Sequence, residues 1–149
     1  MKRLLVVRRA FLAAGLLFGG CTSALPDEAS ITGLHLTTAS AYPENTPPTD
    51  VDVTLTDAAR ARDVYKATLA LPAFPEGIYN CPADFGYTHP IAFVDGEAVS
   101  VTATLNTSGC RDVTIAGASS RRRSDDAYWA LLAANLGVDE STLFTVPGQ

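Results

Sequence analysis

Residues 87–105, YTHPIAFVDGEAVSVTATL, decide the fold because two alternating runs flank a turn signal. In both runs, apolar and polar residues alternate with the period of two that is typical of a half-buried strand. The residues VDG at 94–96 indicate a β-hairpin between the runs. A three-residue loop there, with Gly96 left-handed, pairs Ile91 with Val99 and places all the large apolar residues on one face. We therefore expect an antiparallel hairpin with this register.

The same register predicts the role of Cys81 and Cys110. Continued beyond the hairpin, it brings Cys81 next to Gly109, the neighbour of Cys110. A zinc site is a weaker alternative because the cysteines lack C-x-x-C spacing and the chain has only two histidines. A reactive thiol would need a nearby base and protection from oxidation. In an exported protein we expect a disulfide between Cys81 and Cys110.

Two helices and further strands complete the predicted domain. Alternation over residues 51–56 indicates a strand, and a helix follows it, capped by Thr56 or Asp57 and ended by Pro72. A second helix, capped by Ser124 or Asp125, carries a buried face with Trp129 and stops at Gly137. The order of elements predicts a single α+β domain over residues 31–149. We expect a four- or five-stranded, mainly antiparallel sheet with two helices packed on it and one disulfide.

The first residues predict export and a lipid anchor. Residues 1–20 combine a basic start with an uncharged stretch too short to span a bilayer, as in a signal peptide. The segment LFGGC at 17–21 resembles the lipobox of bacterial lipoproteins, which implies acylation of Cys21 and an anchor in the cell membrane or outer membrane. Residues 21–30 would then be a tether, and the domain would face the periplasm or the cell exterior. RRAFL at 8–12 resembles a twin-arginine signal, so the general secretory and twin-arginine routes both stay open.

The charge of the mature chain excludes one class of partner. Removal of residues 1–20 leaves seven basic and sixteen acidic residues, a net charge of −9. Such a body repels nucleic acid, so we expect no nucleic-acid partner. The triplet RRR at 121–123 is a local exception, which we interpret as a solvated loop partly neutralised by Asp125 and Asp126; a small anion or partner contact is the alternative. We expect a monomer.

Few residues suggest chemistry. His89 falls at an inward strand position and His35 at an outward one, and neither belongs to a hydrolase, metalloprotease or phosphate-loop motif. Asp95 is explained by its turn and Asp112 by an outward strand position. We therefore expect a non-catalytic protein with no cofactor and no metal site, and a hydrolase ranks third among the candidate functions.

Two resemblances concern residues 71–110, and the first of them also covers the final helix with Trp129. The stretch LPAFPEGIYNCPADFGYTHPIAFVDGEAVSVTATLNTSGC is similar to uncharacterised secreted proteins and lipoproteins of actinobacteria and similar bacteria, which implies architecture and location but no activity. Cys81-Pro82, followed by a hairpin and a closing cysteine, also resembles the subtilisin-inhibitor family. That resemblance implies a loop presented to a protease, with Ala83 before the scissile bond and Asp84 after it. The chain lacks the family's other disulfide, and its helical C-terminus has no counterpart there.

The candidate contact loop consists of Pro82, Ala83, Asp84 and Phe85. The leading interpretation is a binding or structural module of the cell envelope, whose partner is an envelope protein or a protease. A protease inhibitor that presents the same loop is the alternative. Burial of Asp84 against backbone amides or the turn at residues 106–109 would favour a structural loop, whereas exposed and extended Ala83 and Asp84 would favour an inhibitor.

Overall fold

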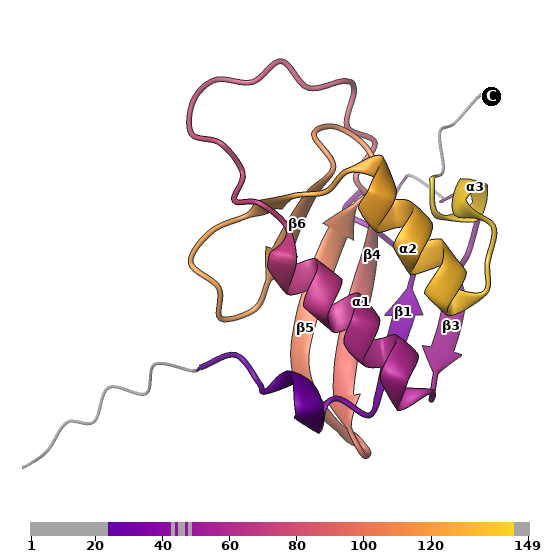
Figure 1. The fold of residues 1–149 in the computed structure, drawn as a ribbon. Helices are drawn as coiled ribbons and strands as arrows, with labels where there is room; N and C mark the ends of the chain where they lie inside the picture. Colours follow the sequence, from indigo (N-terminus) through magenta and orange to yellow (C-terminus); the bar gives the residue numbers. More distant parts are fainter. Residues whose placement is uncertain (1–23, 43, 45–46, 48, 145–149) are drawn as a thin grey trace, which may run out of the picture.

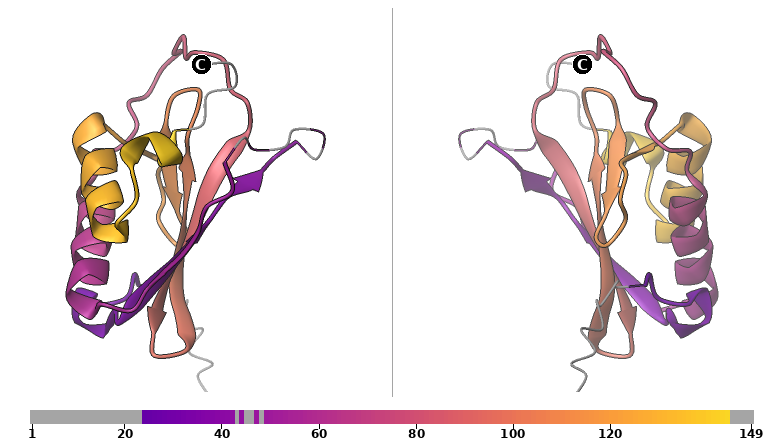
Figure 2. Two further views of the ribbon diagram at one scale, coloured as in Figure 1. Left: turned by 90° about the vertical axis from the view of Figure 1, so that its right-hand side faces the viewer. Right: turned by 90° about the vertical axis from the view of Figure 1, so that its left-hand side faces the viewer.

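The computed structural model describes residues 24–42, 44, 47 and 49–144, in which one antiparallel sheet carries three α-helices on one face (Figures 1 and 2). The elements are η1 (Glu28–Ser30), β1 (Gly33–Thr37), β2 (Ala39–Ser40), β3 (Asp52–Leu55), α1 (Ala58–Ala70), β4 (Tyr87–Asp95), β5 (Ala98–Asn106), β6 (Asp112–Ile115), β7 (Arg122–Arg123), α2 (Asp126–Leu136) and α3 (Glu140–Leu143). The order of strands is β3-β1-β4-β5-β6-β7, and β2 pairs with β4. The predicted α+β class is confirmed. The sheet has seven strands rather than four or five because β2 and β7, of two residues each, were too short to predict.

The core lies between the helices and the sheet. Trp129 and Leu132 of α2 and Val64 and Tyr65 of α1 are fully buried. The Tyr65 ring meets the Phe93 ring of β4 edge to face, with centroids 5.0 Å apart. No helix of the described residues lies on the other face of the sheet (Figure 2). One covered face and one open face explain the alternation of apolar and polar residues along the strands.

The hairpin of β4 and β5 forms, but the predicted register is wrong. Ile91 pairs with Ala103 rather than Val99, and the turn is the two-residue Gly96-Glu97 between Asp95 and Ala98. Gly96 has φ +59°, which suits a tight hairpin turn whose twist matches that of the strands. The irregularity that we assigned to the loop is instead a bulge within the strands, next to Phe93 and Val94.

The predicted buried face survives this error. Ile91 shifts its partner by four residues, an even number, so the side-chain alternation is preserved. Phe93 and Ile91 are buried, and so is Val101 opposite Phe93. Val99, beyond the bulge, is instead 59% exposed.

The two predicted helices, α1 and α2, start with the predicted type of cap. The Asp57 carboxylate accepts hydrogen bonds from the backbone N–H groups of Ala59 and Arg60, and the Asp125 carboxylate accepts one from Tyr128. Of each pair of predicted caps, the aspartate is therefore the one used. Gly137 ends α2 with φ +72°, as predicted. The short helix α3 was missed.

The start of the described chain is docked on α1. The Tyr65 hydroxyl donates to the Pro26 carbonyl over 2.9 Å. The Arg62 guanidinium donates to the carbonyls of Ile31 and Ala29. The last part of the segment that we interpreted as a tether therefore packs on the domain. Cys21 and the predicted signal peptide lie outside the described residues.

Candidate functional site

The predicted disulfide joins Cys81 to Cys110, with Cα atoms 5.0 Å apart. It ties the loop of residues 71–86, which connects α1 to β4 and arches away from the rest of the domain in Figure 1, to the turn that precedes β6. The predicted disulfide is confirmed although the strand register from which we extrapolated it is wrong. The backbone beyond the hairpin is irregular, so the position of Cys81 does not follow the register of β4 and β5. The Thr107 amide donates to Tyr87, and the Gly109 amide donates to the Ala83 carbonyl over 3.3 Å. These bonds bring the loop beside the turn that precedes β6.

Asp84 holds this loop together. Its Oδ1 accepts hydrogen bonds from the Gly86 amide and the Ser108 hydroxyl, both at 2.8 Å. The Ser108 oxygen in turn accepts from the Phe85 amide at 3.1 Å. These are the bonds to a backbone amide and to the 106–109 turn that favour a structural role for Asp84, although its side chain stays exposed.

The four predicted contact residues are not equally accessible. Pro82, Ala83 and Asp84 are exposed, whereas Phe85 is partly buried and its ring stacks on Tyr87, with centroids 6.4 Å apart. Only the first three can therefore meet a partner without rearrangement. Of these, Ala83 has its carbonyl engaged by the Gly109 amide.

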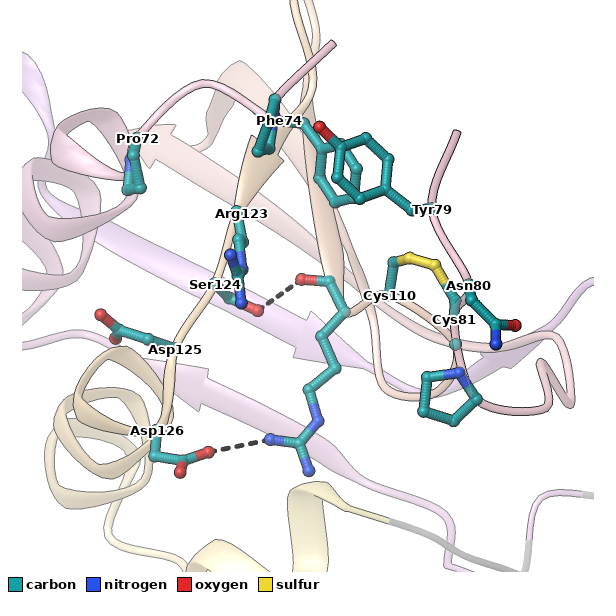
Figure 3. Close-up of a pocket in the computed structure, with 14 residues that line it drawn as sticks. Pro72, Phe74, Tyr79, Asn80, Cys81, Cys110, Arg123, Ser124, Asp125 and Asp126 are labelled. Atoms are coloured by element: carbon teal, nitrogen blue, oxygen red, sulfur yellow. Dashed lines mark hydrogen bonds and ion pairs between the residues drawn. A yellow bond between two sulfur atoms is a disulfide. The ribbon is translucent and has the colours of Figure 1, made fainter. Parts of the chain in front are cut away.

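A hollow of about 690 Å³ lies between the loop and the start of α2 (Figure 3). Phe74, Tyr79 and the disulfide line one part of it, and residues 123–126 line another. The Arg111 guanidinium donates to the Asp126 carboxylate at 2.9 Å (Figure 3). The volume of the hollow is within the range of ligand sites. The charged side chains that line the hollow are largely bonded within the fold, because Asp125 caps α2 and Asp126 pairs with Arg111.

We predicted that the arginine triplet is a solvated loop partly neutralised by Asp125 and Asp126. Arg121 and Arg123 are indeed exposed, but Arg122 and Arg123 form β7, and the acid beside Arg121 is a different one. Arg121 pairs instead with Asp112 at 3.3 Å, and its guanidinium lies over the Phe74 ring, 5.0 Å from the centroid. Arg122 donates to the Leu71 carbonyl at the end of α1, where a cation also complements the helix dipole. Arg123 remains exposed and lines the hollow. The triplet therefore joins the loop and α1 to the sheet edge.

The prediction for Asp112 is also wrong. We expected this residue to point outward into solvent, but it is only 7% exposed. The Asn106 side-chain amide donates to its Oδ1 at 2.8 Å, and Arg121 approaches its other oxygen. This buried carboxylate is thus a structural partner of two side chains.

His89 is inward, as predicted, and has a structural role. Its Nε2 lies 3.0 Å from the Leu143 carbonyl of α3, while Nδ1 lies 3.3 Å from the Thr38 hydroxyl and 3.2 Å from the Thr37 carbonyl. Burial lowers the pKa of the imidazole below its usual value, and the carbonyls of Leu143 and Thr37 oppose this shift only in part. A neutral ring that donates from Nε2 and accepts from Thr38 at Nδ1 fits this environment. His89 therefore fastens α3 to the sheet.

His35 is outward, as predicted, and its Nε2 lies 2.7 Å from the Asp52 carboxylate on the neighbouring strand. It lines a second hollow, of about 440 Å³, which Glu97 and Thr32 also line. The Thr32 hydroxyl is held by the Val94 carbonyl and the Gly96 amide. In the described part of the chain, the His35 ring forms its hydrogen bond with the Asp52 carboxylate. Among the same residues, no group of three or more His, Cys, Asp or Glu side chains is arranged to hold a metal ion.

Comparison of the chain with protein families, with characterised proteins and with solved structures gives no match. No helix in the described ranges is long and apolar enough to cross a membrane. The disulfide of the 71–86 loop and the exposure of Pro82 and Ala83 were predicted from the sequence, whereas the hollow and the roles of Phe74, Tyr79 and Arg111 were not. The density of proline and aromatic residues over 72–79 was the available signal.

Proposed function

We propose that the chain is an exported protein of the cell envelope, anchored through acyl chains on Cys21, and that its domain is a non-catalytic binding module. The anchor would be in the cell membrane or outer membrane, with the domain toward the periplasm or cell exterior. Support for the anchor comes from the lipobox-like LFGGC segment at 17–21. Several acyl chains on one residue give stable attachment, whereas one chain gives only marginal binding.

One observation carries the binding role. The loop of residues 71–86 is exposed at Pro82, Ala83 and Asp84, yet the disulfide and the Asp84 hydrogen bonds fix its conformation. A surface segment that is already ordered loses little conformational entropy when a partner binds. Exposure together with constraint therefore supports recognition of a macromolecule.

The anchor is tested by the intact mass and peptide map of protein purified from its native host's membranes, with and without reductant. We expect acyl chains on an N-terminal Cys21 and a reducible link between Cys81 and Cys110. The matched variant Cys21→Ser should lose the acyl mass and leave the membrane fraction, while it keeps the disulfide. An unmodified Cys21 in membrane-bound protein would refute the anchor.

A protease inhibitor remains the second candidate, because Pro82 and Ala83 stand exposed beside a disulfide. The bond from the Gly109 amide to the Ala83 carbonyl weighs against it, since that carbonyl would have to enter a protease's oxyanion hole. Incubation with a subtilisin-type protease separates the two functions. A binding module leaves the protease active, whereas stoichiometric inhibition that is lost in Ala83→Pro would establish the inhibitor.

A further inference from the structure

Exposed apolar side chains gather around one loop. Large hydrophobic residues that are exposed in the described chain are Tyr42, Ile78, Tyr79 and Val99. Ile78 and Tyr79 belong to the loop of residues 71–86, and the Tyr42 ring lies against Gly86 at its far end. Ile78 is fully exposed, whereas Tyr79 is 43% exposed. A single exposed hydrophobic residue is ordinary, but Ile78 and Tyr79 are adjacent and the Tyr79 ring contacts Phe74, and contiguous exposed apolar surface of this kind marks an interaction site.

The part of the loop that carries Ile78 is held rigid. We call residues 72–80 the arm. The Tyr79 hydroxyl donates to the Glu76 carbonyl at 2.7 Å, across the apex that contains Ile78. The Tyr79 ring meets the Phe74 ring edge to face at 5.3 Å, and Arg121 lies over Phe74. A backbone hydrogen bond from Phe74 to Arg121 and the disulfide secure the two ends of the arm.

This rigidity is relevant because it lowers the cost of binding. Ordering a flexible loop opposes association, and an apex that is already fixed avoids most of that cost. A rigid, exposed aliphatic side chain beside an aromatic ring is suited to enter a recess on another protein, where its apolar surface leaves water.

The charge of the loop restricts the chemistry of that recess. Residues 71–86 contain two acidic side chains, Glu76 and Asp84, and no basic one. Glu76 is exposed next to the apex. Two arginines lie where the arm begins: Arg121, over the Phe74 ring and paired with Asp112, and Arg123, whose amide donates to the Pro72 carbonyl. Within residues 72–80 the one charged residue is Glu76, so lysine or arginine side chains around a recess that receives Ile78 would be complementary to it.

The arm also lies at one end of the domain. In Figures 1 and 2, η1 and the turn of the β4–β5 hairpin lie at the opposite end. The described chain enters the domain through η1. If the chain is anchored at Cys21, a few residues before η1, the arm projects away from the membrane.

We infer that Ile78 is the anchor residue of a docking surface, formed by the arm, for a protein partner that offers an apolar recess rimmed by basic side chains. The inference rests on the proposed binding function and names the partner's chemistry. It moves the centre of contact from Pro82 and Ala83 to the apex of the arm.

The test places a photoreactive side chain at position 78, 82 or 99 of the full chain in its native host. Val99 is the matched control, since it is also an exposed β-branched residue but lies near the hairpin turn at the opposite end. After irradiation, the cross-linked protein is identified by mass spectrometry, purified and titrated with the full chain. We expect an adduct with one extracytoplasmic protein from position 78 and none from position 99.

Binding of that purified protein should then weaken about 10- to 100-fold in Ile78→Ser, the range expected for loss of one buried aliphatic side chain. Val99→Ser should bind like the parent chain, and Glu76→Gln should bind more weakly with a reduced dependence on salt. Equal thermal midpoints of the variants exclude misfolding as the cause.

The outcomes separate the inference from the proposed function. An adduct from position 82 alone, with unchanged affinity in Ile78→Ser, would overturn the inference and leave the binding module in place. Adducts from none of the positions would overturn both. Adducts with glycan or lipid at position 78 would also overturn the inference, because its partner is a protein.

Discussion

Removal of the disulfide is the sharpest test of how the loop is held. In the double variant Cys81→Ala/Cys110→Ala, the unfolded chain is no longer restricted by a cross-link between residues 29 apart. The chain-entropy treatment gives a loss of about 3.6 kcal/mol in the free energy of unfolding for a loop of this length. For a domain whose net stability is about 5–15 kcal/mol, this is a large share. The native fold should persist at room temperature, because the core between helices and sheet is untouched.

Urea denaturation followed by tryptophan fluorescence measures this loss. The chain has one tryptophan, Trp129, and its side chain is fully buried in α2, so its emission reports on global unfolding. With a slope of about 1–3 kcal/mol per M urea, the midpoint should fall by about 1–4 M. Reductant should lower the parent protein to the same midpoint and leave the variant unchanged. A loss below about 1 kcal/mol, with the disulfide verified in the parent, would refute the entropic argument.

Further predictions concern buried and strained groups. Because burial lowers the pKa of His89, the imidazole of the unfolded chain is protonated first as the pH falls. The free energy of unfolding should therefore decrease below about pH 6.5, by at most about 1.4 kcal/mol per pH unit. This dependence on pH should vanish in His89→Gln, and its persistence in urea titrations of that variant would contradict the assignment. Burial raises the pKa of Tyr128 to about 12, so stability should decline as the pH rises from about 10 to 12. Burial also raises the pKa of Tyr65, so ultraviolet titration should show late tyrosines, and the Tyr128→Phe variant should lose one of them. Gly86→Ala should lower the free energy of unfolding by more than about 1 kcal/mol, because φ is +73° and the added Cβ meets the Tyr42 ring. Gly96→Ala should be less destabilising, because its added Cβ meets nothing within 4 Å and only its φ of +59° is unfavourable. Equal thermal midpoints for the two variants would exclude the clash with Tyr42.

The hairpin shows which part of the fold the sequence specifies locally. Alternation in residues 87–105 determines which side chains face the core, and that prediction is confirmed for Ile91 and Phe93. The register in which the two strands pair depends instead on the turn and on a bulge. Neither the turn nor the bulge changes the alternation of side chains along the preceding strand. A register displaced by an even number of residues therefore satisfies the same pattern. Helix caps were predictable for the opposite reason, because Asp57 and Asp125 bond to amides within three residues.

The site was predictable only where its interactions were local or covalent. Cys81 and Cys110, the two cysteines not assigned to lipidation in a chain expected to be exported, were enough to predict the disulfide. The contacts that shape the arm join residues far apart in the sequence, such as Phe74 with Arg121 and Arg122 with Leu71. Asp112 was misplaced in the same way, because its burial depends on Asn106 and Arg121 rather than on its own strand. Such pairs follow from the tertiary arrangement, and no periodicity in one segment encodes them.

The two halves of the loop differ in what binding would cost them. Asp84 already accepts two hydrogen bonds, and the Ala83 carbonyl accepts one, so a partner that displaced them would have to replace each bond that it broke. Ile78 has its whole side chain in water, and its burial requires no bond to be broken. The same loop therefore combines a half that maintains its shape with an apex whose desolvation is favourable. This difference in free energy, more than exposure alone, places the expected contact at the apex of the arm.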